Sequence, residues 1–326
     1  MVRASDGGQI MTPALVRPPL REVRSRIFDS ARWAAYQPRA DDIVIATFPK
    51  CGTTWTQRIV GMLLAGDAAP APMHAPWFDF RLRGTVEETA AEAEGVAGRR
   101  QLKSHLPYDA LPVYEAVRFI HVARDGRDAA MSFHNHLVGF TPMMNEIMDQ
   151  VSLADPKFGD RVAPTPADPA EHFRDWLADG GARGDPGASY WEVERSYWAA
   201  RNEANMLLVH FADMKADLAG EIGRIARFLE IGVPAPTLAQ IVAAADFEAM
   251  RAQGEQLMPG AAIAWVGGAK RFLYKGVNGR WKDVLTQEDL AAYEARAKAE
   301  FSPDLAAWLE GGRLVAGDPV GAVMTQ

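Results

Sequence analysis

The chain has 326 residues, 48% of them hydrophobic and 24% charged, which is an ordinary composition for a globular protein with a sizeable core. Its formal net charge is −7, so it lacks the overall basic field on which general nucleic-acid binding depends. The single cysteine rules out an intrachain disulfide, and neither a signal-peptide-like apolar run nor a membrane-spanning run is found, so a cytoplasmic protein is expected.

The first predicted elements run from the N-terminus to residue 64. Residues 1–20 hold several glycines and prolines and are predicted to be a flexible tail. Residues 21–36 are expected to form an amphipathic helix. Residues 41–48 are apolar and rich in β-branched side chains, which is typical of a buried parallel strand. A helix is expected over residues 53–64, so this stretch predicts a strand, a tight loop and a helix.

The same pattern occurs twice more along the chain. Residues 117–123 and 206–211 are predicted strands, and residues 127–137 and 216–229 are the helices expected after them. Strands that alternate with helices predict a single α/β domain, which we place at residues 21–310, with a central, mostly parallel sheet flanked by helices.

Three other segments differ in composition from these units. Residues 141–188 are rich in proline and are expected to form loops with short helices, as in a lid. Residues 252–280 are rich in glycine and are expected to be mobile. Residues 311–326 are predicted to be a flexible C-terminal tail.

The most informative segment is Thr47-Phe48-Pro49-Lys50-Cys51-Gly52-Thr53-Thr54-Trp55. A strand that turns through glycine into a helix N-terminus is a general anion site, because free backbone N–H groups and the positive end of the helix dipole meet there. Lys50 adds a full positive charge, and Thr53 and Thr54 add hydroxyl donors. The sequence therefore predicts a P-loop-like phosphate site.

Three kinds of phosphate loop were weighed for this segment. A Walker A loop is absent, because Lys50 precedes Gly52 and no earlier glycine has the required spacing. A cysteine phosphatase loop would place an arginine after five intervening residues, whereas six residues separate Arg58 from Cys51. The third alternative, a loop that holds a phosphosulfate, fits the order of residues.

The segment resembles the T-[YF]-P-K-S-G-T-T-W loop of the cytosolic sulfotransferase family. The resemblance implies a bacterial sulfotransferase with 3′-phosphoadenosine 5′-phosphosulfate (PAPS) as co-substrate, 3′-phosphoadenosine 5′-phosphate (PAP) as product and no metal. It also implies that Lys50, Cys51, Gly52, Thr53, Thr54 and Trp55 bind the cofactor. The one departure is Cys51, a weaker donor than the usual serine, which we interpret as a space-filling residue rather than a nucleophile.

Lys103-Ser104-His105-Leu106-Pro107 resembles the K-T-H-L-P segment of the same family. An acceptor hydroxyl attacks sulfur poorly unless its proton leaves during the attack, and histidine suits that task because its ordinary pKa is about 6.5. By this resemblance His105 is the catalytic base and Lys103 faces the transferring group, while Lys50 is expected to stabilise the charge that builds on the leaving phosphate oxygen.

Two further segments resemble those that bind the 3′-phosphate. Residues 122–132 resemble V-x-R-[ND]-x-x-D-x-x-x-S, which assigns Arg124 and Ser132 to the phosphate, although Arg124 could instead form a structural ion pair with Asp128. Residues 272–282 resemble the closing loop R-K-G-x-x-G-x-W-K.

In this closing loop Lys275 and Gly276 match, but Tyr274 stands where the family has an arginine. One phosphate contact is therefore expected to be missing unless Arg271 or Arg280 replaces it.

Aromatic residues are the expected adenine contacts, because aromatic faces stack on bases. Phe211 stands where the family segment Y-E-D-M-K has its tyrosine, so it keeps the ring and loses the hydroxyl. Trp55 and Phe247 are the candidates to sandwich the base, although Trp55 could instead belong to the core.

The acceptor is expected to be a small apolar or aromatic molecule, steroid-like, phenolic or lipid, that carries a hydroxyl or an amine. The basis is a set of large apolar side chains in the loops expected around it: Trp33, Trp77, Phe78, Phe80, Phe140, Met143, Met144 and Met148.

Two other features have weaker interpretations. His134 and His136 are not expected to bind a metal, because alternate residues of a helix point apart and no third ligand accompanies them. A homodimer stays open, because only half of the family's dimer signature is present, at Lys282 and Thr286.

The resemblance predicts in-line displacement at sulfur with His105 as base. Two alternatives stay open: a catalytically inactive relative that binds PAPS or PAP, favoured only by Cys51 and Tyr274, and an ATP-using P-loop kinase.

Overall fold

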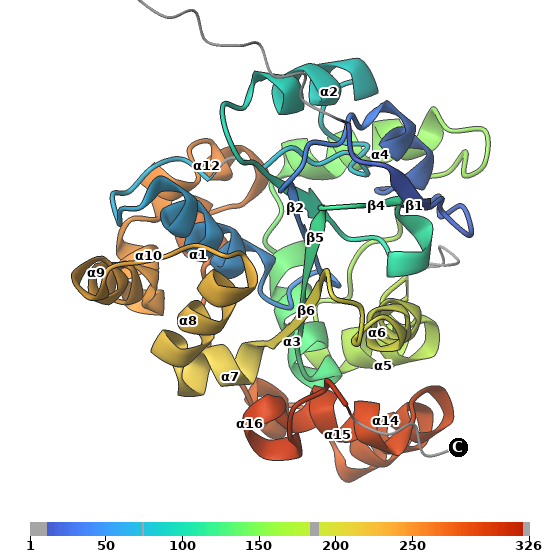
Figure 1. Cartoon of the computed structure of the whole chain (residues 1–326). Helices are drawn as coiled ribbons and strands as arrows, with labels where there is room; N and C mark the ends of the chain where they lie inside the picture. Colours follow the sequence, from blue (N-terminus) through green and yellow to red (C-terminus); the bar gives the residue numbers. More distant parts are fainter. Residues whose placement is uncertain (1–11, 74, 183–188, 322–326) are drawn as a thin grey trace, which may run out of the picture.

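The structure is a computed structural model that describes residues 12–73, 75–182 and 189–321. Its centre is an all-parallel sheet of four strands in the order β3-β2-β5-β6 (Figure 1). The strands are β2 (Ile43–Ala46), β3 (Gln101–Ser104), β5 (Arg118–Ala123) and β6 (Met206–His210). The predicted α/β fold with a central parallel sheet is confirmed.

Two hydrophobic cores cover the two faces of this sheet. Ile43 and Ile45 of β2 point into one core, and Val44 and Ala46 point into the other. Successive strand residues face opposite sides, so an unbroken apolar run is what a strand covered on both faces requires. Helices α1 (Thr53–Ala65), α8 (Leu218–Phe228) and α9 (Ala235–Ala245) lie on one side, and helices α3, α5 and α6 lie on the other (Figure 1).

The remaining elements surround this framework. A small antiparallel sheet joins β1 (Leu15–Arg17) to β4 (Val113–Tyr114). The other helices are α2 (Val86–Gly95), α3 (Gly126–Leu137), α4 (Pro142–Leu153), α5 (Pro169–Asp179), α6 (Tyr190–Ala199), α7 (Phe211–Ala216), α10 (Phe247–Ala252), α11 (Gly254–Leu257), α12 (Ala261–Ala264), α13 (Gly268–Phe272), α14 (Gln287–Glu300), α15 (Pro303–Gly311) and α16 (Arg313–Ala316). Short 3₁₀ helices cover Ser30–Ala35, Tyr108–Ala110 and Arg280–Asp283.

The helix predicted over residues 21–36 is wrong for most of its length. Only Ser30–Ala35 is helical, and as a 3₁₀ helix. Before it, the Ser25 hydroxyl accepts the N–H groups of Ile27 and Phe28, and Phe28 forms a β-bridge with Phe80. A serine that bonds the backbone in this way stabilises a turn at the expense of a helix.

The segment 141–188 is more regular than predicted, because it contains α4 and α5. Pro142 and Pro169 occupy the first position of these helices, and the side chains of Thr141 and Asp168 cap them. Proline is well tolerated at that position because its missing N–H would have no partner within the helix. These two prolines therefore begin helices, whereas the sequence analysis took them as signs of loops. Residues 183–188 lie outside the described part.

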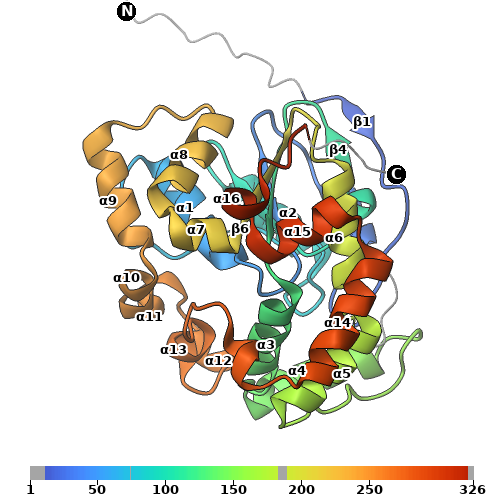
Figure 2. The same ribbon diagram turned by 90° about the horizontal axis from the view of Figure 1, so that it is seen from below.

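Three other predicted segments also contain regular elements. Residues 252–280, expected to be mobile, hold α11, α12 and α13. The expected N-terminal tail contains β1, and the expected C-terminal tail contains α16, which packs beside α7 and α15 (Figure 2). Residues 1–11 and 322–326 lie outside the described part.

Candidate functional site

The four parallel strands end at one edge of the sheet, and a predicted site residue follows each end. Lys50 lies in the loop after β2, His105 directly follows β3, Arg124 directly follows β5, and Phe211 directly follows β6. The carboxyl ends of the strands are where open parallel sheets bind ligands. The fold therefore brings these four segments to one place.

The loop between β2 and α1 has the backbone of an anion site. Lys50 and Gly52 adopt positive φ angles of 72° and 126°, so the chain turns tightly before the helix begins. A Cβ at Gly52 would lie 3.2 Å from Val122 Cγ1 and 3.3 Å from a Phe211 ring carbon, so both space and φ favour glycine. No side chain caps α1, which leaves its first N–H groups for a ligand.

His105 has the hydrogen bonds of a general base. Its Nδ1 lies 2.7 Å from the carbonyl oxygen of Thr47. A carbonyl only accepts, so Nδ1 carries the proton and Nε2 keeps the lone pair. Burial, with the nearby charges of Lys103 and Lys50, lowers the pKa of His105 well below its ordinary value. The ring is therefore neutral at pH 7, and its free nitrogen can accept a proton.

Lys50 and Lys103 are half-buried lysines with lowered pKa values. Burial, together with the charges of Lys103 and Arg124, lowers the pKa of Lys50 to about 7. Burial also lowers the pKa of Lys103 to about 7, against the opposing effect of Asp79. The Lys50 ammonium lies 4.0 Å from the ring centre of Phe272, and that of Lys103 lies 3.5 Å from the ring centre of Trp77. Positive charge held this way is stabilised by a bound polyanion.

Arg124 is only 6% exposed and has neutral partners. It donates to the Val277 carbonyl at 2.9 Å and to Asn278 Oδ1 at 3.0 Å, and no described residue offers an acceptor to its buried Nε. The alternative partner, Asp128, instead accepts the Gly279 N–H at 2.8 Å. The ion-pair interpretation is therefore not the arrangement found. A buried guanidinium with an unused donor points to an anionic ligand.

The predicted adenine contacts adjoin Arg124 and one another. The Phe211 ring lies 4.1 Å from Arg124 Cζ and 5.4 Å from the Trp55 ring. The Phe247 ring lies against Gly276, where a Cβ would come within 2.5 Å of it. Trp55 is only 7% exposed and donates to the Ala245 carbonyl, so it is also a core residue. Stacking on adenine stays a prediction for all three rings.

Tyr274 is surrounded by the cations that were expected to compensate for it. The Cζ atoms of Arg280 and Arg271 lie 5.0 and 5.8 Å from its ring centre, and Lys275 Nζ lies 5.4 Å away. Aromatic faces attract cations at such distances. The tyrosine thus holds two arginines next to the predicted closing loop.

Two predicted cofactor contacts are less well supported by the geometry. Ser132 lies half-buried on α3, and the described residues offer it no hydrogen-bond partner. Cys51 is fully buried, and burial raises the pKa of its thiol well above the ordinary value. A protonated, buried thiol agrees with a space-filling role and not with a nucleophile.

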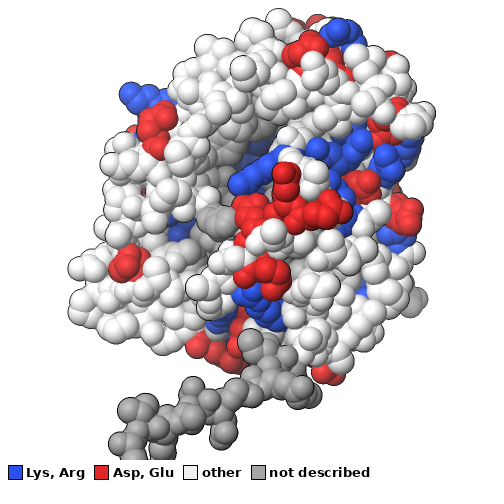
Figure 3. Space-filling model, turned by 90° about the horizontal axis from the view of Figure 1, so that it is seen from above, with Lys and Arg blue, Asp and Glu red and all other residues white. Residues whose placement is uncertain are grey.

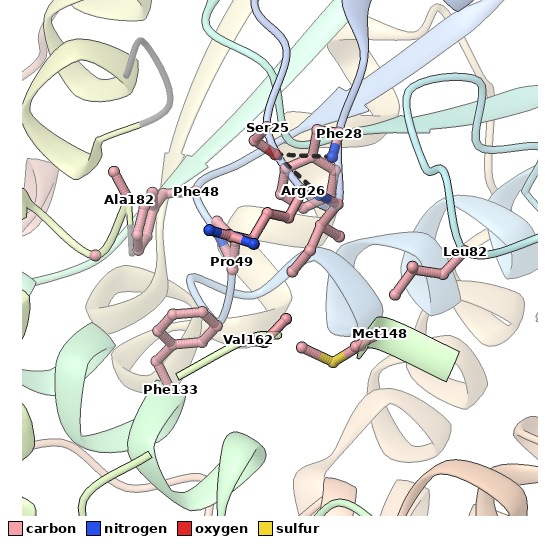
Figure 4. Close-up of a pocket in the computed structure, with 12 residues that line it drawn as sticks. Ser25, Arg26, Phe28, Phe48, Pro49, Leu82, Phe133, Met148, Val162 and Ala182 are labelled. Carbon is pink, nitrogen blue, oxygen red and sulfur yellow. Dashed lines mark hydrogen bonds between the residues drawn. The ribbon is translucent and has the colours of Figure 1, made fainter. Parts of the chain in front are cut away.

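A narrow apolar pocket lies beside this loop (Figure 4). It has about 590 Å³ of empty space, including its open mouth. Its lining comes from seven separate stretches of the chain: Ser25, Arg26, Ile27, Phe28, Phe48, Pro49, Leu82, Phe133, Met148, Val162, Gly181 and Ala182. The Phe28 ring lies 5.5 Å from the His105 ring, so the pocket adjoins the candidate base.

Only Met148 of the expected acceptor-lining side chains lines this pocket. Trp33 and Phe78 are buried in the core, where they contact each other, and Met143 is exposed to solvent. Phe28 and Phe133, which do line the pocket, were not singled out, because no local pattern separates a pocket phenylalanine from a core one.

The comparisons with known proteins agree with this geometry. A profile of the sulfotransferase domain family matches residues 40–303. The chain belongs to the sulfotransferase family. It is 33% identical over 312 residues to a glycolipid sulfotransferase of Mycobacterium bovis, covering 89% of this chain and 94% of that one. It is 26% identical to dog sulfotransferase 1B1, covering 82% and 86% of the two chains.

Solved sulfotransferase structures share the fold. Mouse sulfotransferase SULT7A1, complexed with PAP, superposes with a TM-score of 0.63 at 19% identity, covering 86% of this chain and 90% of that one. Retinol dehydratase, in complex with androsterone and PAP, superposes with a TM-score of 0.59 at 20% identity, covering 81% and 82%. The predicted family, reaction class and α/β fold are confirmed.

The structure also reveals two residues of this sulfotransferase site that the sequence analysis missed. Asp79 is fully buried and accepts hydrogen bonds from the His105 N–H, at 3.1 Å, and from the indoles of Trp33 and Trp77. His136, considered only as a metal ligand, has its Nδ1 3.3 Å from Lys50 Nζ. Asp79 lies outside the family motifs, and His136 lies four residues beyond Ser132 on the same helix, so only the fold brings these two residues to their partners.

The described residues were also searched for metal sites and membrane spans. Within residues 12–73, 75–182 and 189–321, no three His, Cys, Asp or Glu side chains are grouped so as to hold a metal ion. In the same ranges no helix is both long and apolar enough to cross a bilayer.

Proposed function

We propose that this sulfotransferase uses His105 as the base that takes the proton of an acceptor hydroxyl or amine while the sulfonate group of PAPS is transferred. The observation that carries the proposal is the bond of His105 Nδ1 to the Thr47 carbonyl, which leaves Nε2 without a hydrogen-bond partner among the described residues. An imidazole fixed in that tautomer is ready to accept a proton without rearrangement.

The loop residues would hold the phosphosulfate and stabilise the charge that develops on its leaving oxygen. Lys50, Lys103 and the first N–H groups of α1 supply the positive end, and Gly52 allows the backbone to approach closely. Preorganised donors of this kind typically contribute about 10²–10³ each in rate. The residues fit a sulfated nucleotide because Lys50 and Lys103 hold positive charge in half-buried positions, where Asp79 near Lys103 offsets only part of it.

The 3′-phosphate would lie against Arg124, whose buried Nε has no other acceptor. Lys275, Gly276 and Ser132 are the other proposed contacts, and Trp55, Phe211 and Phe247 are proposed to hold the adenine. Lys and Arg side chains line a hollow on one face of the molecule (Figure 3), so local positive charge exists in spite of the net charge of −7.

The acceptor proposed for this site carries an apolar portion next to its reactive group. The narrow pocket is lined mainly by aromatic and aliphatic side chains, and it adjoins His105 through Phe28. Such a lining favours an apolar ring or chain over a sugar alone. The bacterial relatives named as glycolipid sulfotransferases are consistent with an acceptor that has a lipid part.

Two finer proposals rest on sequence alone. A cytoplasmic location follows from the single cysteine, and a homodimer from Lys282 and Thr286. Thr286 already has a structural role as the N-cap of α14, in a capping box with Asp289, so its presence does not require a partner.

The decisive experiment compares His105→Ala and His105→Asn with the wild type. Asn can donate to the Thr47 carbonyl but cannot act as a base, so it separates the structural role of His105 from the chemical one. We expect both variants to bind PAP as the wild type does and to lose about 10²–10⁴ in turnover, measured with labelled PAPS and a panel of phenols, sterols and lipid alcohols. Turnover near the wild-type level in either variant contradicts the assignment.

A binding comparison tests the alternatives. We expect PAP to raise the melting temperature more than ATP with Mg²⁺ does, because Arg124 and the closing loop offer sites for a 3′-phosphate. A larger shift with ATP and Mg²⁺ would favour the kinase. Binding of PAP with no transfer to any acceptor, and no slow PAPS hydrolysis, would favour the inactive relative.

A further inference from the structure

The side chain that directly contacts the Lys50 ammonium is a histidine. His136 lies in the last turn of α3, and its Nδ1 is 3.3 Å from Lys50 Nζ. An ammonium group only donates, so Nδ1 must be the acceptor, and the ring proton then sits on Nε2. His136 can hold Lys50 in this way only while the imidazole is neutral.

An aromatic cage fixes the orientation of the His136 ring. The ring centres of Phe140 and Trp265 each lie 5.0 Å from it, and that of Phe272 lies 5.7 Å from it. Phe272 also lies under the Lys50 ammonium at 4.0 Å. His136 in the last turn of α3 and Phe272 at the end of α13 therefore both contact the Lys50 ammonium.

The charges around the pair keep His136 neutral. Burial, followed by the charges of Lys50, Lys103 and His105, lowers the pKa of His136 well below its ordinary value. Lys50 in turn faces Lys103 and Arg124, which lower its pKa, and Cys51, which opposes them weakly.

Cys51 explains why a separate support for Lys50 is needed. A lysine side chain loses rotamer entropy when it is fixed in one conformation, so its position must be stabilised by contacts. Cys51, the neighbour in the loop, is fully buried with a protonated thiol and is a weak hydrogen-bond donor. The described contacts of the Lys50 ammonium are instead His136 and Phe272.

We propose that His136 is a positioning residue for Lys50, an inference that rests on the proposed function. Its Nδ1 takes one of the three N–H groups of the ammonium and leaves the other two for the phosphosulfate. The cofactor then meets a lysine that is already oriented, so less binding free energy is lost in ordering it.

The test compares His136→Asn with His136→Phe. The amide oxygen of Asn can occupy the position of Nδ1 and accept from Lys50, whereas Phe fills the aromatic cage without an acceptor. We expect the Kd for PAP, measured by calorimetry, to rise about tenfold in H136F, because that is the size of effect typical for the loss of a hydrogen bond to a charged group. In H136N we expect the Kd to rise by less than about threefold.

The pH dependence provides a readout that a merely structural role would not change. PAP binding requires charged Lys50, so affinity falls as the pH rises through the Lys50 pKa of about 7. Loss of the His136 acceptor destabilises the charged form of Lys50 and so lowers its pKa. The affinity for PAP should therefore begin to fall at lower pH in H136F, and at the same pH as in the wild type in H136N. Lys103 has a pKa of about 7 as well, but its contribution is common to all the proteins compared.

The outcomes separate this inference from the proposed function. If the wild type does not bind PAP, the proposed function fails. If the wild type binds PAP and H136F shows the same Kd and the same pH dependence, the positioning role is overturned and the proposed function stands. His136→Leu serves as a second variant without an acceptor if H136F does not fold, as checked by circular dichroism, and equal binding by it overturns the role too.

Discussion

Arg124 is a buried guanidinium whose Nε finds no hydrogen-bond partner in the described part of the chain. Leaving a charged donor unsatisfied costs about 1–3 kcal/mol or more, and the nearby charges of Asp128 and Asp125 offset this cost only in part. Neighbouring Phe211 contributes a cation–π contact at 4.1 Å, and the loop carbonyl of Val277 accepts one hydrogen bond. The arginine therefore lowers the stability of the unliganded protein and raises its affinity for an anion.

Arg280 is expected to supply the 3′-phosphate contact that Tyr274 has lost. Its guanidinium is held 5.0 Å from the Tyr274 ring centre and is close enough to Arg124 to lower the pKa of that arginine. We expect Arg280→Gln to raise the Kd for PAP about tenfold and to leave the Kd for 5′-AMP, which lacks the 3′-phosphate, unchanged.

Calorimetry with both nucleotides checks this prediction. Lys282→Gln is the matched control, because Lys282 is an exposed cation two positions along the same segment and is expected to have no effect. Equal losses for PAP and 5′-AMP in the Arg280 variant would show that it acts on the fold or on the adenine, and the assignment would be wrong.

For single residues, the sequence predicts the position in the fold well when a local motif surrounds the residue. Lys50, His105 and Arg124 lie where the motifs imply, each just past the end of a strand. Asp79 and His136 escaped prediction because their contacts join segments distant in sequence: Asp79 reaches His105, and His136 reaches Lys50. A helical pattern shows on which face of its helix a residue lies, but it does not show which distant loop packs against that face.

Among the elements, the strand–loop–helix unit of β2 and α1 depends most on one residue. Gly52 combines a φ of 126° with near contacts to Val122 and Phe211. We expect Gly52→Ala to destabilise the protein by about 1–3 kcal/mol in urea unfolding, through strain and crowding, and to raise the Kd for PAP more than tenfold, because the loop can no longer present its N–H groups.

Gly66 is the natural control for this prediction. It ends the same helix with a φ of 71° and has open space around it. Gly66→Ala should therefore cost only the strain of the left-handed conformation, about 1–2 kcal/mol, and leave PAP binding unchanged. If both variants bind PAP equally well, Gly52 does not act through the loop.

The predicted strands and the helices after them were found because their apolar runs and periodicity are local signals. The prediction failed where tertiary contacts or caps decide the structure. Phe28 pairs with Phe80 in place of continuing a helix, and Pro142 and Pro169 begin helices that the side chains before them cap. From the sequence, a proline in a loop cannot be told from a proline at the start of a helix unless the capping residue before it is recognised.

In the molecule as a whole, the C-terminal helix α16 packs against α7 and α8. The buried carboxylate of Asp213 accepts the backbone N–H groups of Arg313 and Leu314 at 2.7 and 3.0 Å. The Arg313 guanidinium pairs with Glu221, which is fully buried. The expected C-terminal tail thus satisfies two buried acids of the domain.

Deletion of residues 312–326 is therefore expected to destabilise the protein by about 2–4 kcal/mol, because Asp213 loses two donors and Glu221 keeps only Arg224. Deletion of residues 318–326 removes the end of the chain but none of these bonds and is the control. Urea unfolding of the three proteins measures the effect. Equal stability of all three would contradict the docking described here.

The bond between His105 and the Thr47 carbonyl has a consequence for the order of events in a turnover. Nδ1 is hydrogen-bonded to the backbone, so protons can enter and leave the imidazole only at Nε2. Under the proposed mechanism, the proton taken from the acceptor must depart on the side where the sulfated product lies. Release of the product and resetting of the base are then successive steps through one opening, and a slowly departing product holds the enzyme in its protonated form.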